Sequence, residues 1–414
     1  MEKPKIRFKG YQEDWEQRKL SDLVIDHNAG IYISKEDYGE GTNVIGVGNI
    51  YDRDIFNGEI YRLGPVNDDK FILEENDIIY GESSLVPEGI ARTVCVGKNG
   101  AGSAFAWHTR RVKLDKNIVN SHVATLELNY LHDIRKYLVS VSTQTALTGM
   151  TTEGYFGATL TLPSVEEQQK ISSYFKNLDH LITLHQRKCE ETKILKKYML
   201  QKMFPQNGHS VPEIRFSGCT EDWEQRKLED FGKATGGTSI ESEFSEDGIY
   251  KVISIGSYSE NSVYNDQGIR AIKSDKTSNR VLNRNDLTMI LNDKTTSGNI
   301  IGRVLLIEES GIYVYNQRTE RIEINLDEYD PVFLYEMLNA PNIREKIIKQ
   351  AQGNTQIYVN WTAISLLEYM IPSKEEQVKI GEYLHSISNL ITLHQQKCDE
   401  LRNIKKFMLQ NMFI

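Results

Sequence analysis

The chain has 414 residues, of which 39% are hydrophobic and 26% charged, and its formal net charge is −9 at pH 7. This balance is ordinary for a globular protein, and the length exceeds what one core normally supports, so we expect two or more domains. The sequence has no apolar run of membrane-spanning length, no secretory signal and no Cys-x-x-Cys pair among its four cysteines. These features argue against a membrane or secreted protein and predict a cytoplasmic one with reduced thiols.

The first predicted element is a short segment, IRFKGYQEDWEQRKLSDL (residues 6–23). Its Trp15 is expected to anchor a core rather than to contact a ligand. Residues 24–162 follow, with strand-like apolar runs such as NVIGVGNIY and a helical pattern near residues 129–141. We therefore expect residues 1–162 to form a first domain with both strands and helices.

A long helix is predicted next, over residues 163–205. Ser164 is a candidate N-cap, with Glu167 three residues on as in a capping box. Helix-forming residues then continue for about 40 positions, too long for an ordinary globular helix. Apolar residues recur every seven positions, which predicts a coiled coil. The expected core positions of this helix are Ile171, Leu178, Leu181, His185 and Met199.

The second half of the chain repeats this order. Residues 6–23 return at residues 214–231, displaced by 208 positions, and residues 163–204 return at 372–413, displaced by 209. More than half of the aligned residues are identical, whereas residues 24–162 and 232–371 share a pattern but little sequence. The chain is thus a tandem duplication, with a second domain at residues 206–371 and a second long helix at residues 372–414. The expected core positions of that helix are Ile380, Ile387, Leu390, His394, Leu401 and Met408.

The fold that we predict is of the α+β class. Two globular α/β domains are joined by two long helices that form an antiparallel coiled coil, with pseudo-twofold symmetry from the duplication. Antiparallel pairing is favoured because it places Phe204 beside Pro372, so that the second domain starts and ends at one place. Parallel pairing would require that domain to span the whole helix length.

A histidine and a cysteine four residues apart occur in both helices, as His185 with Cys189 and His394 with Cys398. Such pairs raise the possibility of a zinc site. In an end-matched antiparallel pair, however, the cysteines point toward opposite ends, roughly 12 Å apart at about 1.5 Å per residue. We therefore expect no metal and interpret the histidines as a polar layer that sets the register of the helices.

The layout and the repeated motifs resemble the specificity (S) subunit of type I DNA restriction-modification systems. The resemblance covers essentially the whole chain and rests on the tandem order, the two IRF-x-G segments and the two PS-x-EEQ helices. It implies that the domains are target recognition domains, each reading one half of an asymmetric bipartite DNA site, and that the helices are spacers. It also implies a role in DNA methylation and host defence without catalytic residues in this chain.

The resemblance further implies the partners. They are double-stranded DNA, two methyltransferase (modification) subunits and the endonuclease/translocase (restriction) subunits. S-adenosylmethionine, ATP and Mg are expected on those subunits and no cofactor in this chain. In agreement, the sequence has no Walker A motif, no Gly-x-Gly-x-x-Gly opening a helix, and no Asn/Asp-Pro-Pro-aromatic run. The alternative is a two-headed coiled-coil adaptor that binds proteins and has no DNA specificity.

Side chains that read base edges are polar or basic and lie on exposed loops. In the first domain this predicts DNA contacts from Ser83, Ser84, Arg92, Arg110, Arg111, Thr143, Gln144, Thr151, Thr152 and Tyr155. In the second domain it predicts Thr238, Ser239, Lys294, Thr295, Thr296, Arg303, Arg318, Asn354, Gln356, Tyr358 and Asn360. Because the chain is acidic overall, attraction to phosphates is expected from local patches and from partner subunits.

Overall fold

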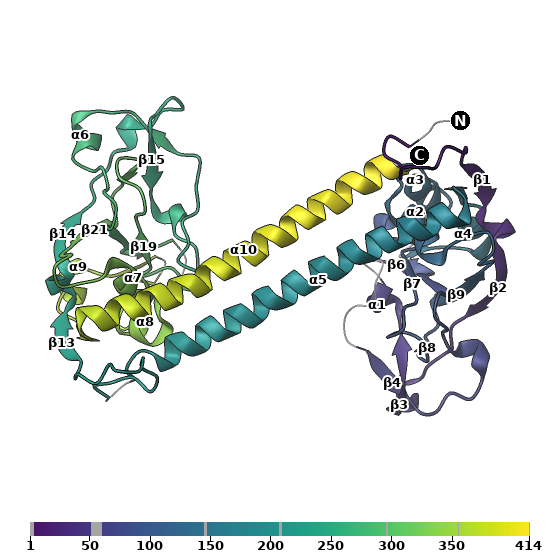
Figure 1. The fold of residues 1–414 in the computed structure, drawn as a ribbon, viewed down its shortest axis with the longest axis horizontal. Coiled ribbons are helices and arrows are strands. Elements are labelled where there is room, and N and C mark those ends of the chain that lie inside the picture. The colour runs from purple at the N-terminus through teal and green to yellow at the C-terminus, as the bar shows by residue number, and fades with distance from the viewer. Residues whose placement is uncertain are drawn as a thin grey trace. The chain divides into compact units, whose positions relative to one another are not determined.

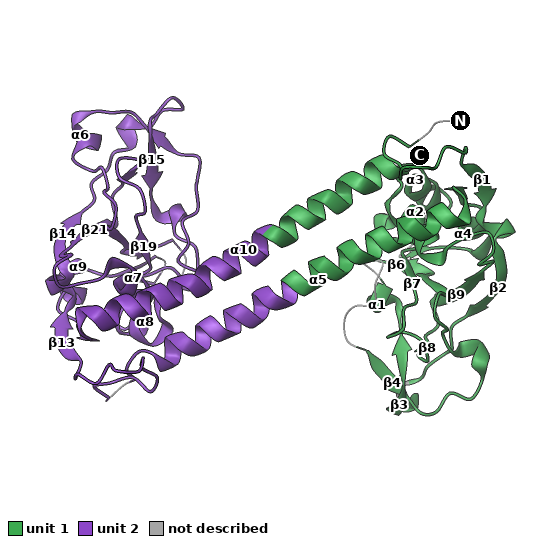
Figure 2. Ribbon diagram, viewed as in Figure 1, with its two compact units in different colours: residues 1–185, 397–414 green, residues 186–396 purple. Residues whose placement is uncertain are grey.

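The computed structural model describes residues 4–50, 60–144, 147–206, 209–294, 297–354 and 356–413. The chain divides into two compact units, which Figure 2 shows in different colours. Unit 1 comprises residues 1–185 and 397–414, and unit 2 comprises residues 186–396. The division cuts both long helices, so each unit contains part of each. No helix among the described residues is long and apolar enough to cross a membrane.

Unit 1 is built around a four-stranded antiparallel sheet (Figure 1). Its order is β2 (Val24–Ala29), β9 (Thr109–Leu114), β5 (Ile78–Gly81) and β7 (Thr93–Cys95). Three smaller sheets surround it: β1 (Glu16–Lys19) with β12 (Thr159–Leu162), β4 (Tyr61–Leu63) with β3 (Tyr38–Ile45) and β8 (Ala104–Phe105), and β10 (Thr143–Gln144) with β11 (Thr148–Gly149) and β6 (Ser83–Ser84).

Unit 2 repeats this topology although its sequence differs. Its four-stranded sheet has the order β14 (Gly232–Gly236), β21 (Thr319–Ile324), β17 (Leu287–Ile290) and β19 (Val304–Leu306). The smaller sheets are β13 (Glu224–Lys227) with β23 (Glu368–Ile371), β16 (Arg270–Ala271) with β15 (Tyr250–Ile253) and β20 (Tyr313–Tyr315), and β18 (Asn292–Asp293) with β22 (Ile357–Tyr358). The similar apolar patterns of residues 24–162 and 232–371 thus produce equivalent strand pairs, except that among the described residues no strand of unit 2 corresponds to β10.

Two consecutive helices cover each four-stranded sheet. They are α2 (Ser121–Tyr130) and α3 (His132–Ser140) in unit 1, and α7 (Pro331–Asn339) and α8 (Pro341–Ile348) in unit 2. Side-chain oxygens cap the first helix of each pair, from Asn120 and from Asp330, as N-capping requires. Shorter helices are α1 (Val47–Ile50), α4 (Thr152–Phe156), α6 (Asp275–Ser278) and α9 (Trp361–Ile364).

The long helices are α5 (Val165–Lys202) and α10 (Lys374–Met412). The Ser164 hydroxyl accepts a hydrogen bond from the Glu167 N–H, as an N-cap does. The Glu167 carboxylate, however, binds Arg7 through both oxygens at 2.8 Å, and Glu376 binds Arg215 in the same way at 2.9 and 2.6 Å. These buried bidentate pairs tie the repeated N-terminal segment of each half to the first turn of its long helix.

Within each unit the two long helices run antiparallel. In unit 1, Lys405 binds Asp179 at 2.7 Å and the Cys398 thiol lies 3.6 Å from the Ile182 carbonyl oxygen. Earlier positions of α5 therefore meet later positions of α10. Unit 2 shows the same order, because Lys196 binds Ser388 at 2.7 Å and the Cys189 thiol lies 3.9 Å from the Ile391 carbonyl oxygen. The antiparallel coiled coil expected from the sequence is confirmed.

The buried seam differs in part from the predicted one. Leu181 and Leu390 are 39% and 47% exposed, so their assignment to the core is wrong. In α5 the next residue, Ile182, is buried instead of Leu181, because buried positions along the helix alternate steps of four and three residues. In unit 1 the α5 seam is Ile171, Phe175, Leu178 and Ile182. Of the other predicted core positions, Ile380, Ile387 and Leu401 are buried, and His185, Met199, His394 and Met408 are half-buried.

The repeated tryptophans are core residues, as predicted. Trp15 is 2% exposed and Trp223 is 3% exposed. Trp15 contacts Phe413 with ring centroids 6.1 Å apart, and Trp223 contacts Phe333 at 6.3 Å. Each tryptophan packs the repeated N-terminal segment against the core of its unit. Burial of this large ring stabilises the segment in that position.

Candidate nucleic-acid interface

A polar strip lies beside the central strand of unit 1. After Gly81 the chain leaves strand β5 and forms β6, where Ser83 pairs with Gly149 and Ser84 with Thr148. Strand β10 extends this sheet, since Thr143 pairs with Gly149 and Gln144 with Thr148. The sheet therefore brings together four residues predicted as DNA contacts from two distant parts of the chain. We call β6, β10 and β11 the polar strip of unit 1.

Unit 2 has an equivalent polar strip. Strand β18 follows β17 as β6 follows β5, and Asn292 pairs with Tyr358 while Asp293 pairs with Ile357. The next backbone bond is also repeated: the Met150 N–H donates to the Glu82 carbonyl in unit 1, and the Val359 N–H donates to the Leu291 carbonyl in unit 2. We call β18, β22 and the exposed flanking residue Lys294 the polar strip of unit 2.

The two strips share a backbone arrangement and differ in side chains. Thr143 is exposed and Ser83 half-exposed in unit 1. In and beside the strip of unit 2, the exposed predicted residues are Lys294, Asn354, Gln356, Tyr358 and Asn360. Thr295, Thr296 and the side chain of Gln144 lie outside the described part of the chain. Hydroxyl, amide and ammonium groups of this kind can bind base edges or phosphates, although the Thr143 hydroxyl also donates to the Gly149 carbonyl and the Tyr358 hydroxyl to Gln352.

A tight corner adjoins each strip. In unit 2, Arg318 is exposed and has a positive φ of 68°, and its carbonyl accepts from the Leu291 N–H next to β18. The Gly237 N–H donates to the Thr319 carbonyl, which brings Thr238 and Ser239 to the same corner. Thr238, Ser239 and Arg318 are therefore near one another, as a shared DNA-contacting surface requires.

Glu241 lies among the polar groups of this corner. Hydrogen bonds from Ser239, Asn316 and Gln317, together with the nearby Arg318 charge, lower the pKa of Glu241. The carboxylate is exposed and stays ionised at neutral pH. It holds the corner loop in place. Its negative charge lies near the positive charge of Arg318 and repels DNA phosphates.

Three predicted contacts are buried, and for them the prediction is wrong. Tyr155 is fully buried, stacks on Tyr80 with centroids 3.7 Å apart and shares a 2.8 Å hydrogen bond with the Thr93 hydroxyl. Arg111 is 3% exposed and binds Asp26 at 2.7 Å. Ser84 is 3% exposed and donates to the Val86 carbonyl at 2.7 Å. These side chains serve the core and a turn, so they cannot reach a base edge.

Other predicted arginines are half-buried and already have partners. Arg92 donates to the Asn129 carbonyl at 2.8 Å, and Arg110 binds Glu82 at 2.6 Å. Arg303 donates to the Ser262 hydroxyl at 3.0 Å, and burial lowers the pKa of its guanidinium. These bonds orient the loops behind the strips. A DNA contact from any of these arginines would have to replace or share them.

Thr151 and Thr152 start helix α4. The Thr151 hydroxyl accepts from the Gly154 N–H at 3.0 Å as the N-cap, and Thr152 is half-exposed. Thr151 is exposed, so capping and an outside contact are compatible. These two residues follow β11 after Met150 and border the polar strip of unit 1.

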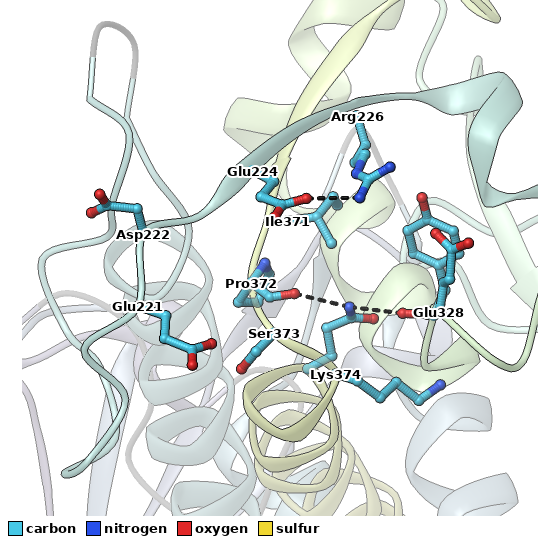
Figure 3. A pocket seen from close by; sticks show the side chains of 11 residues that line it. Glu221, Asp222, Glu224, Arg226, Glu328, Ile371, Pro372, Ser373 and Lys374 are labelled. Carbon is cyan, nitrogen blue, oxygen red and sulfur yellow. Dashed lines mark hydrogen bonds and ion pairs between the residues drawn. The ribbon is translucent and has the colours of Figure 1, made fainter.

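The pocket in Figure 3 is lined by several acidic residues. It measures about 240 Å³ and lies in unit 2 at the start of α10. Glu221, Asp222, Glu224 and Glu328 line it, and of these Glu224 is paired with Arg226 at 2.7 Å. Arg226 and Lys374 also line the pocket, but the four carboxylates outnumber them and disfavour phosphate, so we do not assign this pocket to the nucleic-acid interface.

Sequence reasoning missed several residues of these surfaces. Asn292 is half-exposed in the strip of unit 2, and Tyr32, Trp107 and His108 are exposed at the corner of unit 1. The internal repeat contained the signal for Asn292, because it stands 209 positions after Ser83. The aromatic residues were harder to find, since exposed rings cannot be told from core residues by type alone.

No group of three or more histidine, cysteine, aspartate or glutamate side chains among the described residues is arranged to hold a metal ion. The exposed polar side chains of the strips and corners can form hydrogen bonds with a ligand.

Comparison with known proteins gives a family for both halves. Residues 12–193 and 220–403 each match the model of the type I restriction modification DNA specificity domain. A curated relative, the type I restriction enzyme MjaVIII specificity subunit of Methanocaldococcus jannaschii, is 26% identical over 351 residues, which cover 82% of this chain and 79% of the relative.

Solved structures have the same fold. The S subunit of a type I restriction-modification system from M. genitalium matches with a TM-score of 0.66 at 14% identity, over 100% of this chain and 99% of that one. A structure described as explaining complex assembly and conformational transition of a type I system matches with a TM-score of 0.50 at 13% identity, over 97% and 98% of the two chains. At these identities the likeness concerns the fold alone.

Proposed function

This chain belongs to the family of type I restriction modification DNA specificity domains, and from that premise we propose how its two units recognise DNA. The chain is the specificity subunit of a type I restriction-modification complex. Each unit reads one half of a bipartite DNA site through its polar strip and the adjoining corner. We propose residues 1–162 and 206–371 as the two target recognition domains.

The observation that supports this proposal most directly is the contrast between frame and strip. The two units repeat the same strand pairs and the same backbone hydrogen bonds around the strip. The side chains on that backbone differ, with Ser83 and Thr143 in one unit against Asn292, Lys294 and Tyr358 in the other. One scaffold with two sets of polar side chains is what an asymmetric bipartite target requires, because base edges are distinguished by donor and acceptor pattern.

The exposed surface of the long helices supports two copies of one partner. In unit 2, Leu195 and Tyr198 of α5 are 42% and 46% exposed, and in unit 1 the equivalent Phe407 of α10 is 54% exposed. Leu181 in unit 1 and Leu390 in unit 2 are also equivalent and exposed. Apolar residues at steps of three and four that face solvent are typical of a surface that packs against a partner helix. Since both units have this surface, we propose that each binds one methyltransferase subunit.

Catalysis and cofactors belong to the partners in this proposal. The chain is the non-catalytic member of a complex that acts on cytoplasmic DNA. The methyltransferase subunits would bind S-adenosylmethionine, and the endonuclease subunits would bind ATP and Mg. The acidic net charge of −9 also places much of the phosphate attraction on those subunits. The isolated chain is therefore expected to bind DNA weakly at physiological salt.

The test is the methylation pattern of the assembled complex. The chain is co-expressed with its methyltransferase subunits, and the methylome of those cells is compared with that of cells lacking this chain. The proposal expects one new bipartite motif with two different halves separated by a fixed spacer. A complex that assembles but modifies no bipartite motif, and selects none from a random duplex library, would contradict it and favour the protein adaptor.

A further inference from the structure

The corner of unit 1 differs in chemistry from that of unit 2. Both corners have the same backbone: the Gly30 N–H donates to the Thr109 carbonyl as the Gly237 N–H does to the Thr319 carbonyl, and His108 has the same positive φ of 68° as Arg318. Where unit 2 has Thr238, Ser239 and Arg318, however, unit 1 has aromatic side chains. These are Tyr32, Trp107 and His108, which we call the aromatic corner.

The aromatic corner is exposed and well ordered by its own contacts. Tyr32 is 69% exposed and Trp107 is 50% exposed. Their rings meet edge to face with centroids 5.2 Å apart, and the Trp107 ring lies 3.8 Å from that of His108. The backbone N–H of Trp107 also donates to the Ile31 carbonyl at 2.7 Å. The rings are thus fixed on a rigid turn while much of their apolar surface contacts solvent.

The corner is continuous with the polar strip of unit 1. The His108 carbonyl accepts from the Glu82 N–H at 2.8 Å, and Glu82 precedes Ser83 of strand β6. On the other side, Glu82 binds Arg110 at 2.6 Å. DNA bound at Ser83 therefore also lies beside the aromatic corner. His108 stands where Arg318 stands in unit 2, so no guanidinium occupies that position in unit 1.

We propose that the aromatic corner reads a thymine in the first half-site through apolar contact with its C5-methyl group. This inference rests on the proposed function and names what one part of that interface recognises. In the major groove the thymine methyl is the apolar feature that distinguishes base pairs, and apolar side chains select it. A rigid pair of rings adjoining a hydrogen-bonding strip fits such a contact better than a contact with phosphate.

The experiment uses duplexes in which deoxyuridine replaces thymine, because this removes the methyl group and leaves base pairing intact. The complex with methyltransferase subunits is prepared, its motif is determined, and each thymine on both strands is replaced singly. Burial of one methyl group predicts that one replacement weakens binding about three- to fivefold. The Trp107→Ala complex should bind the thymine and uracil duplexes equally at that position. Trp107→Phe should keep a difference between them.

A matched control is Tyr38→Ala, which removes an aromatic ring of similar exposure, 47%, from the same unit. The thymine preference should survive this change. A bipartite motif in which no thymine effect depends on Trp107, or a half-site of G·C pairs only, overturns this inference and leaves the proposed function standing. A complex that modifies no bipartite motif overturns both.

Discussion

Glu127 and Glu336 are equivalent buried carboxylates with unequal partners. Glu336 binds Lys196 at 2.9 Å and accepts from the Ser388 hydroxyl at 3.1 Å. Glu127 accepts one hydrogen bond, from the Thr161 N–H at 2.8 Å, and its other oxygen has no hydrogen-bond partner. In unit 1 the equivalent lysine, Lys405, binds Asp179 instead. Burial consequently raises the pKa of Glu127 to about 8.

This difference predicts a pH dependence of stability in unit 1. The folded pKa of Glu127 lies above its usual value, so the folded state binds more protons between about pH 4.5 and 8 and loses stability as pH rises through that window. Glu127→Gln removes this dependence. Its stabilising effect should be on the order of 3 kcal/mol larger at pH 8 than at pH 5.5. Hydrogen exchange of the α2 amides measures the local free energy of opening.

Glu336→Gln is the matched control. It weakens a paired carboxylate, so it should destabilise unit 2 at both pH values and leave Lys196 without its anion. If Glu127→Gln also destabilised unit 1 equally at both pH values, Glu127 would be an ionised structural residue and our account of it would be wrong.

Basic residues of the unit 2 interface should differ in what they contribute. Lys294 is an exposed point charge, so Lys294→Ala should weaken binding of all sequences and lower the salt-dependence slope by about one.

Arg318 lies in the fixed corner, where a guanidinium can bind a base edge with two hydrogen bonds. Arg318→Ala should cost about 1–3 kcal/mol and relax selectivity at one base pair of the second half-site. Competition binding of the assembled complex on single-base variants, at several salt concentrations, separates the two effects.

At the scale of elements, the long helices have two apolar faces. The buried face packs within each unit, with Ile171 and Phe175 in unit 1 and Ile380 and Leu384 in unit 2. The second face includes the exposed Tyr198 and its equivalent Phe407. One heptad-like sequence can therefore serve both the internal helix pair and a partner. This explains why Leu181, which we predicted as a core position, is exposed.

The exposed face leads to a prediction about stoichiometry. Tyr198→Asp should remove one bound methyltransferase subunit, because a charge at an apolar contact is costly to bury. Tyr198→Asp combined with Phe407→Asp should remove both. Native mass spectrometry of the co-purified complex counts the copies. Thr392→Asp, which places the same charge at an exposed threonine that already lies among polar residues, serves as the control. Full occupancy in the double variant would place the methyltransferase site elsewhere.

At the scale of the whole molecule, the chain combines a repeated frame with two different inserts. The frame contains the bidentate pairs Arg7–Glu167 and Arg215–Glu376, the tryptophans and the long helices. The inserts contain the strips and corners. Because the frame is the same at both junctions, an insert should be able to fold on either copy of it.

A chimaera tests this modularity. If residues 24–162 are replaced with residues 232–371, the methylated motif should acquire two half-sites of the same sequence. The half-site read by unit 2 should not change. Methylome sequencing gives the motif directly. A change in both half-sites would show that the inserts do not read independently.

The sequence by itself determined the duplication, the two long helices and their antiparallel pairing. These features depend on repetition and periodicity, which are local properties of the chain. The polar residues of β6 and β10, and Tyr358 of β22, could also be proposed from sequence, since they lie in polar segments that follow apolar runs or precede a proline. The family resemblance rested on the same repeated motifs, and the matches to both halves confirmed it.

The tertiary structure alone decided which side chains are available. Tyr155 and Arg111 looked like loop residues but are buried, because β5 brings Tyr80 against Tyr155 and β2 brings Asp26 against Arg111 of β9. Trp107 is exposed on a tight corner, which its residue type does not indicate. Exposure depends on strands that pair across long stretches of sequence, such as β6 with β11, and a periodic pattern carries no information about those partners.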